Sequence, residues 1–215
     1  MKTIKKPLTL IFLGLQGSGK GTQAYILREK YGFEILDTGN ILRHMIINKI
    51  GPLKIIKTIE KGNLVPPMTT NKIIDKAISK VSTKTSLIID GFPRTPMQIY
   101  HLNKILNKTK RIDNYFAIYL KISKKTAIKR VENRWSCSSC GTVYVKNIGR
   151  CTSCNGLIAK RKDDSFQYIQ KRLHNVSKFL DKVADYYKKR NKLIEINAER
   201  SIQEISKDII ARINI

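Results

Sequence analysis

Residues 14–22 read GLQGSGKGT and follow directly on the apolar run LTLIFL at 8–13. Glycines allow a loop to turn tightly and to point its N–H groups at phosphate oxygens, and a lysine in the loop can reach the terminal phosphates. A helix that begins at such a loop adds the positive end of its dipole. We therefore predict a strand, a phosphate-binding loop and a helix that together bind a nucleoside triphosphate. A glycine-rich turn without a ligand is the alternative.

The residue after Lys20 narrows the type of loop. The general pattern G-x-x-x-x-G-K-[ST] places a hydroxyl residue at that position, where it contacts magnesium. This chain has Gly21 there instead. The loop is therefore not of the common GTPase or motor type.

Apolar runs and helical periodicity alternate along the 215 residues. We expect strands at 8–13, 87–90, 115–120 and 192–196, and helices at 21–30, 39–48, 54–61, 71–79, 97–106, 124–134, 166–189 and 202–214. This alternation favours a mostly parallel sheet covered by helices. The length is sufficient for one α/β domain with insertions.

The composition is strongly basic. Lys and Arg number 42 against 16 Asp and Glu, which gives a formal net charge of +26. Such a charge attracts phosphates, whether they belong to a nucleotide, a nucleic acid or an acidic lipid. The lysines are spread along the chain and the aromatic residues do not interleave with them, so compositional bias together with a phosphate site is the favoured explanation. An additional polyanion-binding role is the alternative.

The sequence contains no apolar run of about eighteen residues, the length that a membrane-spanning helix needs. The first residues, MKTIKKP followed by the apolar run 8–13, resemble a secretion signal. However, the apolar core is short, no small-residue cleavage site follows it, and it leads straight into the phosphate-binding loop. We therefore expect a cytoplasmic protein without a membrane partner.

All four cysteines lie in two C-x-x-C pairs, Cys137 with Cys140 and Cys151 with Cys154. Two such pairs separated by ten residues bring four thiolates within reach of one tetrahedral ion. Zinc suits a closed set of four thiolates, and its role would be structural because no position is left for a substrate. Residues 142–145, between the pairs, are expected to form a strand of a small ribbon. Iron in the same cage and disulfide bonds are the alternatives.

A second chemical motif begins at the end of the predicted strand 87–90. The strand ends in Asp90, and in phosphate-loop enzymes a carboxylate at such a position holds Mg²⁺, usually through its water shell. Gly91 and Pro93 set a bend at the carboxyl end of the strand, where open α/β sheets bind ligands. Arg94 follows the bend and can grip a phosphate with two parallel hydrogen bonds.

Four motifs together resemble the adenylate kinase family in their order and spacing. They are GSGKGT at 17–22, TGNILR at 38–43, DGFPRT at 90–95 followed by Gln98, and RKDD at 161–164 followed by Arg172. The resemblance covers essentially the whole chain, and the DGFPRT motif is highly specific. The cysteine cluster is similar to that of the long-lid, metal-bearing members of the family.

The resemblance implies an α/β fold of the P-loop NTPase type. A parallel sheet flanked by helices would form the core (1–36, 67–132 and 165–215), with a small helical insertion for the nucleoside monophosphate (37–66) and a zinc-ribbon lid (133–164). The implied activity is reversible phosphoryl transfer from Mg·ATP to AMP, which gives two ADP. The implied cofactors are Mg²⁺ with ATP and a structural Zn²⁺, in a monomer that has no nucleic-acid partner.

The resemblance also implies roles for individual residues. The ATP side would comprise Gly17, Ser18, Gly19, Lys20, Gly21, Thr22, Arg130, Arg134, Val143 and Tyr144. The AMP side would comprise Thr38, Arg43, Asn63, Leu64, Val65, Gly91, Phe92, Pro93, Arg94, Gln98, Arg161 and Arg172. The groups expected to take part in the transfer are Lys20, Arg94, Arg134, Arg161, Arg172 and Asp90, with Asp163 or Asp164 in supporting roles.

The chain also departs from the family pattern. Asn40 stands where the family usually has Asp, PMTT at 67–70 lacks the usual acid, and INA at 196–198 replaces the usual Ile/Val-Asp-Gly. These differences concern the affinity for the monophosphate rather than the phosphate contacts. A kinase for another nucleoside monophosphate, or one with GTP as donor, is the nearest alternative, although Thr38 and Gln98 favour adenine in the acceptor. A nucleic-acid-binding ATPase is the alternative from another class.

Overall fold

The structure is a computed structural model that describes residues 6–48, 50, 55, 57–58, 65–161 and 166–214. The predicted helix 54–61 is described only at residues 55, 57 and 58. Four predicted site residues lie outside the described residues, namely Asn63, Leu64, Asp163 and Asp164.

Five parallel strands form the main sheet of the described chain. They are β1 (Thr9–Leu13), β2 (Glu34–Asp37), β3 (Leu87–Asp90), β4 (Tyr115–Lys121) and β8 (Leu193–Asn197), in the order β2-β3-β1-β4-β8. Each neighbouring pair is parallel. The four predicted strands are confirmed to within one residue at each end, but β2 was missed. Only Leu36 of β2 is buried, so this edge strand has no apolar run to reveal it.

Helices cover both faces of the sheet. Their bounds are α1 Lys20–Tyr31, α2 Thr38–Ile47, α4 Pro67–Ile78, α5 Pro96–Lys108, α6 Lys124–Glu132, α7 Phe166–Lys188 and α8 Ile202–Arg212. In β1, Leu10 and Phe12 belong to a buried cluster with α1 and α8. Ile11 and Leu13 face the opposite layer, which α4, α5, α6 and α7 supply. A strand with both faces covered is apolar throughout, which explains the run 8–13.

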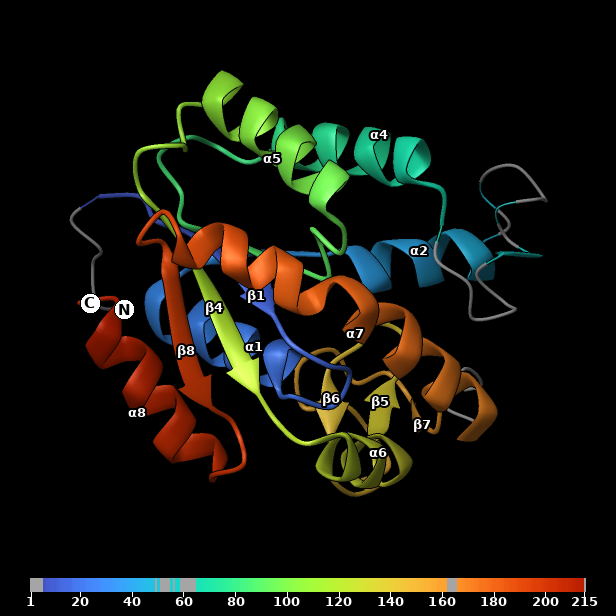
Figure 1. Cartoon of the computed structure of the whole chain (residues 1–215). Helices are drawn as coiled ribbons and strands as arrows, with labels where there is room; N and C mark the ends of the chain where they lie inside the picture. Colours follow the sequence, from blue (N-terminus) through green and yellow to red (C-terminus); the bar gives the residue numbers. More distant parts are fainter. Residues whose placement is uncertain are drawn as a thin grey trace.

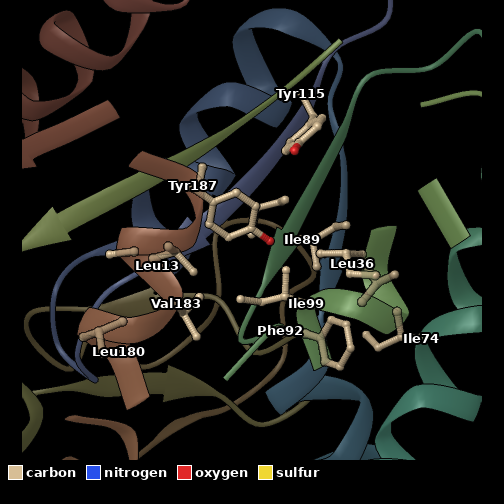
Figure 2. Close-up of a cluster of buried hydrophobic side chains, with 14 of the residues drawn as sticks. Leu13, Leu36, Ile74, Ile89, Phe92, Ile99, Tyr115, Leu180, Val183 and Tyr187 are labelled. Atoms are coloured by element: carbon tan, nitrogen blue, oxygen red, sulfur yellow. The ribbon is translucent and has the colours of Figure 1, made fainter. Parts of the chain in front are cut away.

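The larger cluster contains the side chains that hold α4, α5 and α7 against the sheet. Figure 2 shows Ile74 and Ile99 beside Phe92, and Leu180, Val183 and Tyr187 of α7 on the other side of the cluster. Helix α4 begins at Pro67, four residues before the predicted start at 71. The segment PMTT is therefore its first turn, where proline is tolerated because the first helical N–H needs no partner.

A second, smaller sheet forms the lid of the described chain. Its strands are β5 (Trp135–Cys137), β6 (Val143–Tyr144) and β7 (Ile158–Ala159), paired antiparallel in the order β6-β5-β7. The predicted ribbon strand 142–145 corresponds to β6. In Figure 1 the arrowheads of β4 and β8 point toward α6 and these lid strands. No helix in the described ranges is both long and apolar enough to cross a membrane.

The strand register sets the position of the site. Asp90 is aligned with Phe12 of β1 on one side and with Asp37 of β2 on the other. The phosphate-binding loop begins just beyond β1. Because the carboxyl ends of parallel strands meet at one edge, the loop and both carboxylates lie at the same edge of the sheet.

Candidate active site

The phosphate-binding loop depends on glycine at two positions. Gly14 has φ +141° and Gly17 has φ +84°. A β-carbon on Gly14 would lie 2.6 Å from the carbonyl oxygen of Leu120, and one on Gly17 would lie 2.7 Å from that of Ala127. Only glycine fits these conformations and these close approaches.

Helix α1 begins directly at the loop. The N-cap residue Gly19, which precedes the helix, provides no side-chain cap, and the first turn, which the structure describes in full, holds no acidic residue. The first N–H groups of the helix therefore stay available for an anion.

Lys20 is the cation of this loop. Its Nζ donates hydrogen bonds to the carbonyl oxygens of Gly14 (3.1 Å) and Leu15 (3.0 Å). Burial lowers the pKa of Lys20, while the nearby Asp90 carboxylate opposes that shift. A half-buried ammonium held over the loop carbonyls is suited to neutralise a phosphate that enters the same space.

Asp90 and Asp37 place two carboxylates beside Lys20. Burial raises the pKa of Asp90 to about 6; Lys20 lowers it and Asp37 raises it further. Asp37 accepts a hydrogen bond from the backbone N–H of Asn40 at 2.9 Å, and its other oxygen lies 3.9 Å from Arg43 Nη2. Asp37 was not among the predicted site residues. A carboxylate at the end of a strand predicted Asp90 as a site residue. The same pattern would have predicted Asp37 if β2 had been recognised as a strand.

The bend after β3 fixes Arg94. The Phe92–Pro93 peptide bond is cis. Arg94 Nε donates to the carbonyl oxygen of Gly91 at 2.9 Å, and its backbone N–H donates to Gln98 Oε1 at 2.6 Å. Burial lowers the pKa of Arg94, and the carboxylate of Asp90 opposes this shift. The guanidinium therefore lies half-buried beside the acid that ends β3, and Gln98 is held by the backbone of the same residue.

A small cavity of about 180 Å³ lies between α2, α4 and α5. Its lining includes half of the predicted AMP-side residues that the structure describes, namely Thr38, Val65, Gly91, Arg94 and Gln98. Thr38 Oγ1 is buried and has no hydrogen-bond partner among the described residues. An unpaired buried hydroxyl is costly, so a ligand that hydrogen-bonds to it would be favoured here.

The main cavity is larger, about 1040 Å³, and arginines surround it. Most of the predicted phosphate-binding residues line it, namely Gly17, Gly19, Lys20, Gly21, Thr22, Arg43, Asp90, Pro93, Arg94, Arg134, Arg161 and Arg172. Among the described residues that were predicted to contact the nucleotides, two do not line either cavity. Ser18 is buried beneath the loop, and Phe92 is fully buried in the core cluster. Both therefore support the site from beneath.

The predicted ATP side is completed by residues far apart in the sequence. Arg130 donates hydrogen bonds to the carbonyl oxygens of Ala198 (2.9 Å) and Glu199 (3.5 Å). Val143 and Tyr144 of the lid line the same cavity. Residues 199–202 after β8 also line it, and the sequence analysis did not place them in the site.

Arg161 connects the lid strands with the turn of the first cysteine pair. Its Nε donates to Ser136 Oγ at 3.0 Å, and its Nη2 donates to the carbonyl oxygen of Gly141 at 3.2 Å. The guanidinium is therefore fixed from two elements of the lid. Arg161 also lines the main cavity, so the lid contributes a positive charge to it.

The four cysteines converge as their spacing predicts. Their Sγ atoms all lie within 4.8 Å of one another, and the pairs Cys137–Cys154 and Cys140–Cys151 are 3.5 Å apart. These separations are too long for disulfide bonds. Tetrahedral zinc thiolates have Sγ–Sγ edges of about 3.8 Å, so the cluster fits one zinc ion.

Hydrogen bonds around two of the sulfur atoms, those of Cys137 and Cys151, favour thiolates, whereas the neighbouring thiols raise the pKa of Cys154. Cys137 Sγ accepts from the backbone N–H groups of Ser139 (3.4 Å) and Cys140 (3.5 Å). Burial raises the pKa of Cys137, but these bonds and those with the thiols of Cys154 and Cys140 together lower it more, and the net shift is downward. Cys151 Sγ accepts from the hydroxyl of Tyr144 at 3.2 Å. Metal ligands need such deprotonated sulfur, so the surroundings also fit a metal.

Comparison with known proteins identifies the family. A family model described as adenylate kinase matches residues 12–192. The chain belongs to the adenylate kinase family. An adenylate kinase from Chlamydia felis is 35% identical over 210 residues, which cover 96% of this chain and 97% of that protein. An adenylate kinase from Thermosipho africanus is 32% identical over 211 residues, covering 94% of this chain and 98% of its own length.

Family membership confirms the fold and the activity that the motifs predicted. Adenylate kinases transfer a phosphoryl group reversibly between ATP and AMP, giving ADP, and use Mg²⁺ with ATP. One departure from the family pattern lies at the edge of the main cavity. Asn40 Oδ1 accepts a hydrogen bond from Arg43 Nη2, so an amide oxygen takes the place of the usual carboxylate beside this arginine.

Proposed function

We propose that the chain transfers the γ-phosphoryl group of Mg·ATP in line to AMP, with ATP in the main cavity and AMP in the small one. The observation that carries this assignment is that the two cavities share Leu42, Val65, Gly91 and Arg94 in their linings. Two ligands would therefore meet at Arg94. An enzyme that holds both reactants in a fixed geometry gains a large part of its rate acceleration for phosphoryl transfer in this way.

The acceptor end is suited to adenosine monophosphate. Arg43 and Arg94 would hold its phosphate, and the hydroxyl of Thr38 would contact the base or ribose. In this proposal Gln98 reads the edge of the adenine with its side-chain amide. Gln98 Oε1 already accepts from Arg94 N, which fixes the direction of the amide and leaves its NH₂ group to donate.

The charge of the transferred group would be neutralised from several sides. Lys20 approaches from the loop, while Arg134, Arg161 and Arg172 line the cavity from the link between α6 and β5, the lid and α7. Asp90 would hold Mg²⁺, which would supply positive charge against the phosphate oxygens. The buried Asp90 carboxyl, whose pKa is raised by burial, fits this role because a bound cation would favour its ionised form.

The lid would exclude water from the main cavity, because water that reached the bound ATP would hydrolyse it. We infer that zinc in the cysteine cluster is structural, since four thiolates fill its coordination sphere. One chain supplies both cavities, so a monomer suffices. Free thiols in the cluster suit a reducing compartment such as the cytoplasm.

Product analysis tests the assignment. The purified chain, loaded with zinc, receives Mg·ATP and AMP, and the nucleotides are separated by chromatography over time. The proposal expects two ADP for each ATP consumed and almost no phosphate release when AMP is omitted. Hydrolysis of ATP at equal rates with and without AMP would contradict it.

The same samples test the nucleic-acid alternative. Binding of the chain to single-stranded RNA is measured as the salt concentration rises. Basic proteins that bind nucleic acid lose affinity steeply with salt. We expect no measurable binding at about 150 mM salt, a concentration at which specific complexes persist.

A further inference from the structure

The second cysteine pair of the lid contacts the helix that follows the phosphate-binding loop. Tyr25 lies on α1, and its hydroxyl is 2.8 Å from Ser153 Oγ, between Cys151 and Cys154. The two residues are 128 positions apart in the sequence. The contact therefore joins the core directly to the turn that would hold the metal.

The tyrosine ring is held in place from its own helix. The guanidinium carbon of Arg28 lies 4.7 Å from the centroid of the Tyr25 ring, one turn further along α1. A cation over the ring face restrains the ring. Because both residues line the main cavity, the hydroxyl of Tyr25 is presented to the lid at the ATP end.

The partner on the lid is equally well fixed. The backbone N–H of Ser153 donates to Cys151 Sγ at 3.4 Å, and the hydroxyl of Tyr144 donates to the same sulfur at 3.2 Å. Tyr144 Oη also accepts from the N–H of Thr152 at 3.1 Å. Movement of this turn away from α1 would thus carry Tyr144, which lines the main cavity, with it.

We propose that Tyr25 is a positioning residue that holds the metal-bearing turn at Ser153 on α1 and so keeps the ATP end of the cavity closed. This inference rests on the proposed function, because it assigns ATP to that end. The hydroxyl does not touch the reacting phosphates. It acts through the lid, by making the closed arrangement more stable than the open one.

The contact is solvent-exposed, so its effect is modest. Water replaces either hydroxyl when the lid opens, and a net hydrogen bond between neutral groups changes an equilibrium by about threefold, or about 0.7 kcal/mol. Loss of the bond should therefore lower kcat/KM for Mg·ATP about threefold. The KM for AMP and the kcat should equal those of the parent chain, because the transfer step itself is untouched.

Steady-state kinetics of zinc-loaded Tyr25→Phe and Ser153→Ala, alone and combined, test the proposal. We expect each single variant to lower kcat/KM for Mg·ATP about threefold, and the double variant to show no further loss. Melting temperature and zinc content should equal those of the parent chain. Tyr100→Phe is the matched control, because this exposed tyrosine of α5 lines neither cavity.

Two results would overturn the positioning role. One is a Tyr25→Phe variant whose kcat/KM for Mg·ATP equals that of the parent and of Tyr100→Phe. The other is a double variant whose loss is the product of the two single losses, since the residues would then act independently. Failure of the parent chain itself to transfer phosphate from ATP to AMP would strike the proposed function instead.

Discussion

Gly141 of the lid lies against Asn40 of α2. A β-carbon on Gly141 would stand only 2.6 Å from Asn40 Oδ1, and Gly141 has φ +76°. The carbonyl oxygen of Gly141 accepts from Arg161, while Asn40 Oδ1 accepts from Arg43. Two arginines of the main cavity, one from the lid and one from α2, are therefore linked through this contact. The lid is closed on the AMP side of the site as well as on α1.

We predict that Gly141→Ala impairs closure. The added methyl group would push against Asn40 and displace the lid, and misplacement of catalytic groups by about an ångström costs tenfold or more in kcat. The strain of a positive φ would also lower stability by about 1 kcal/mol. Steady-state assays at saturating AMP and calorimetry measure the two effects separately.

Asn40→Ala in the Gly141→Ala background provides the matched control. Removal of the amide makes room for the methyl group, so kcat should recover while the melting temperature stays low. A double variant whose kcat is as low as that of Gly141→Ala would show that the contact does not limit closure.

Arg94→Ala should cost kcat/KM about 100-fold or more, corresponding to about 3 kcal/mol, because the guanidinium is a charged group shared by both cavities. Arg94→Lys keeps the charge but loses the two-pronged geometry, and we expect an intermediate loss. Arg190→Ala, an exposed residue at the end of α7, is the control and should be near normal. Near-normal activity of Arg94→Ala would remove this residue from the transfer.

Activity should depend on the ionisation of Asp90. Burial raises its pKa to about 6, so a proton returns to the carboxyl as the pH falls through that value. Protonation competes with Mg²⁺, and the apparent affinity for Mg²⁺ should weaken about tenfold between pH 7 and pH 5. Titration of activity with Mg²⁺ at each pH measures this.

The control for the pH series is Asp90→Asn. Protonation of the nucleotide affects this variant and the parent equally. Only the parent should therefore show the additional loss of apparent Mg²⁺ affinity as the pH falls. Parallel pH profiles of the two proteins would exclude Asp90 as the titrating group.

Loss of one thiolate should release the metal from the lid. We expect Cys140→Ser to contain less than one zinc per chain and to melt about 5 °C lower, corresponding to about 2 kcal/mol. Ser138→Ala keeps all four thiols and is the control, with zinc retained. Metal analysis measures the zinc content of each protein, and thermal melting measures its melting temperature. A parent protein that holds no metal, together with an unchanged melting curve for Cys140→Ser, would contradict a structural zinc site.

Local sequence signals were sufficient for the loop, the buried strands and the metal cluster. The apolar run before Gly14 predicts β1 because both faces of that strand are covered. The cysteine spacing predicts convergence of the Sγ atoms because each pair spans a single tight turn. Edge strand β2 could not be recognised, since only Leu36 is buried in it.

Contacts between distant segments were beyond sequence reasoning. Asp37 joins the site only because β2 pairs in register with β3 and aligns it with Asp90. Likewise, Arg130 meets the carbonyl oxygen of Ala198 because β8 ends beside α6, and Tyr25 meets Ser153 through lid closure. No local spacing encodes such pairs, so they had to be read from the structure.

The most direct test of the account is ADP formation by the zinc-loaded chain, given Mg·ATP and either AMP, GMP, CMP or UMP in parallel. We expect rapid ADP formation with AMP and little with the other three, because Thr38 and Gln98 line the small cavity that we assign to the acceptor. Equal or greater transfer to another monophosphate would contradict the assignment of that cavity to AMP. No transfer to any of the four would contradict the proposed phosphoryl transfer itself.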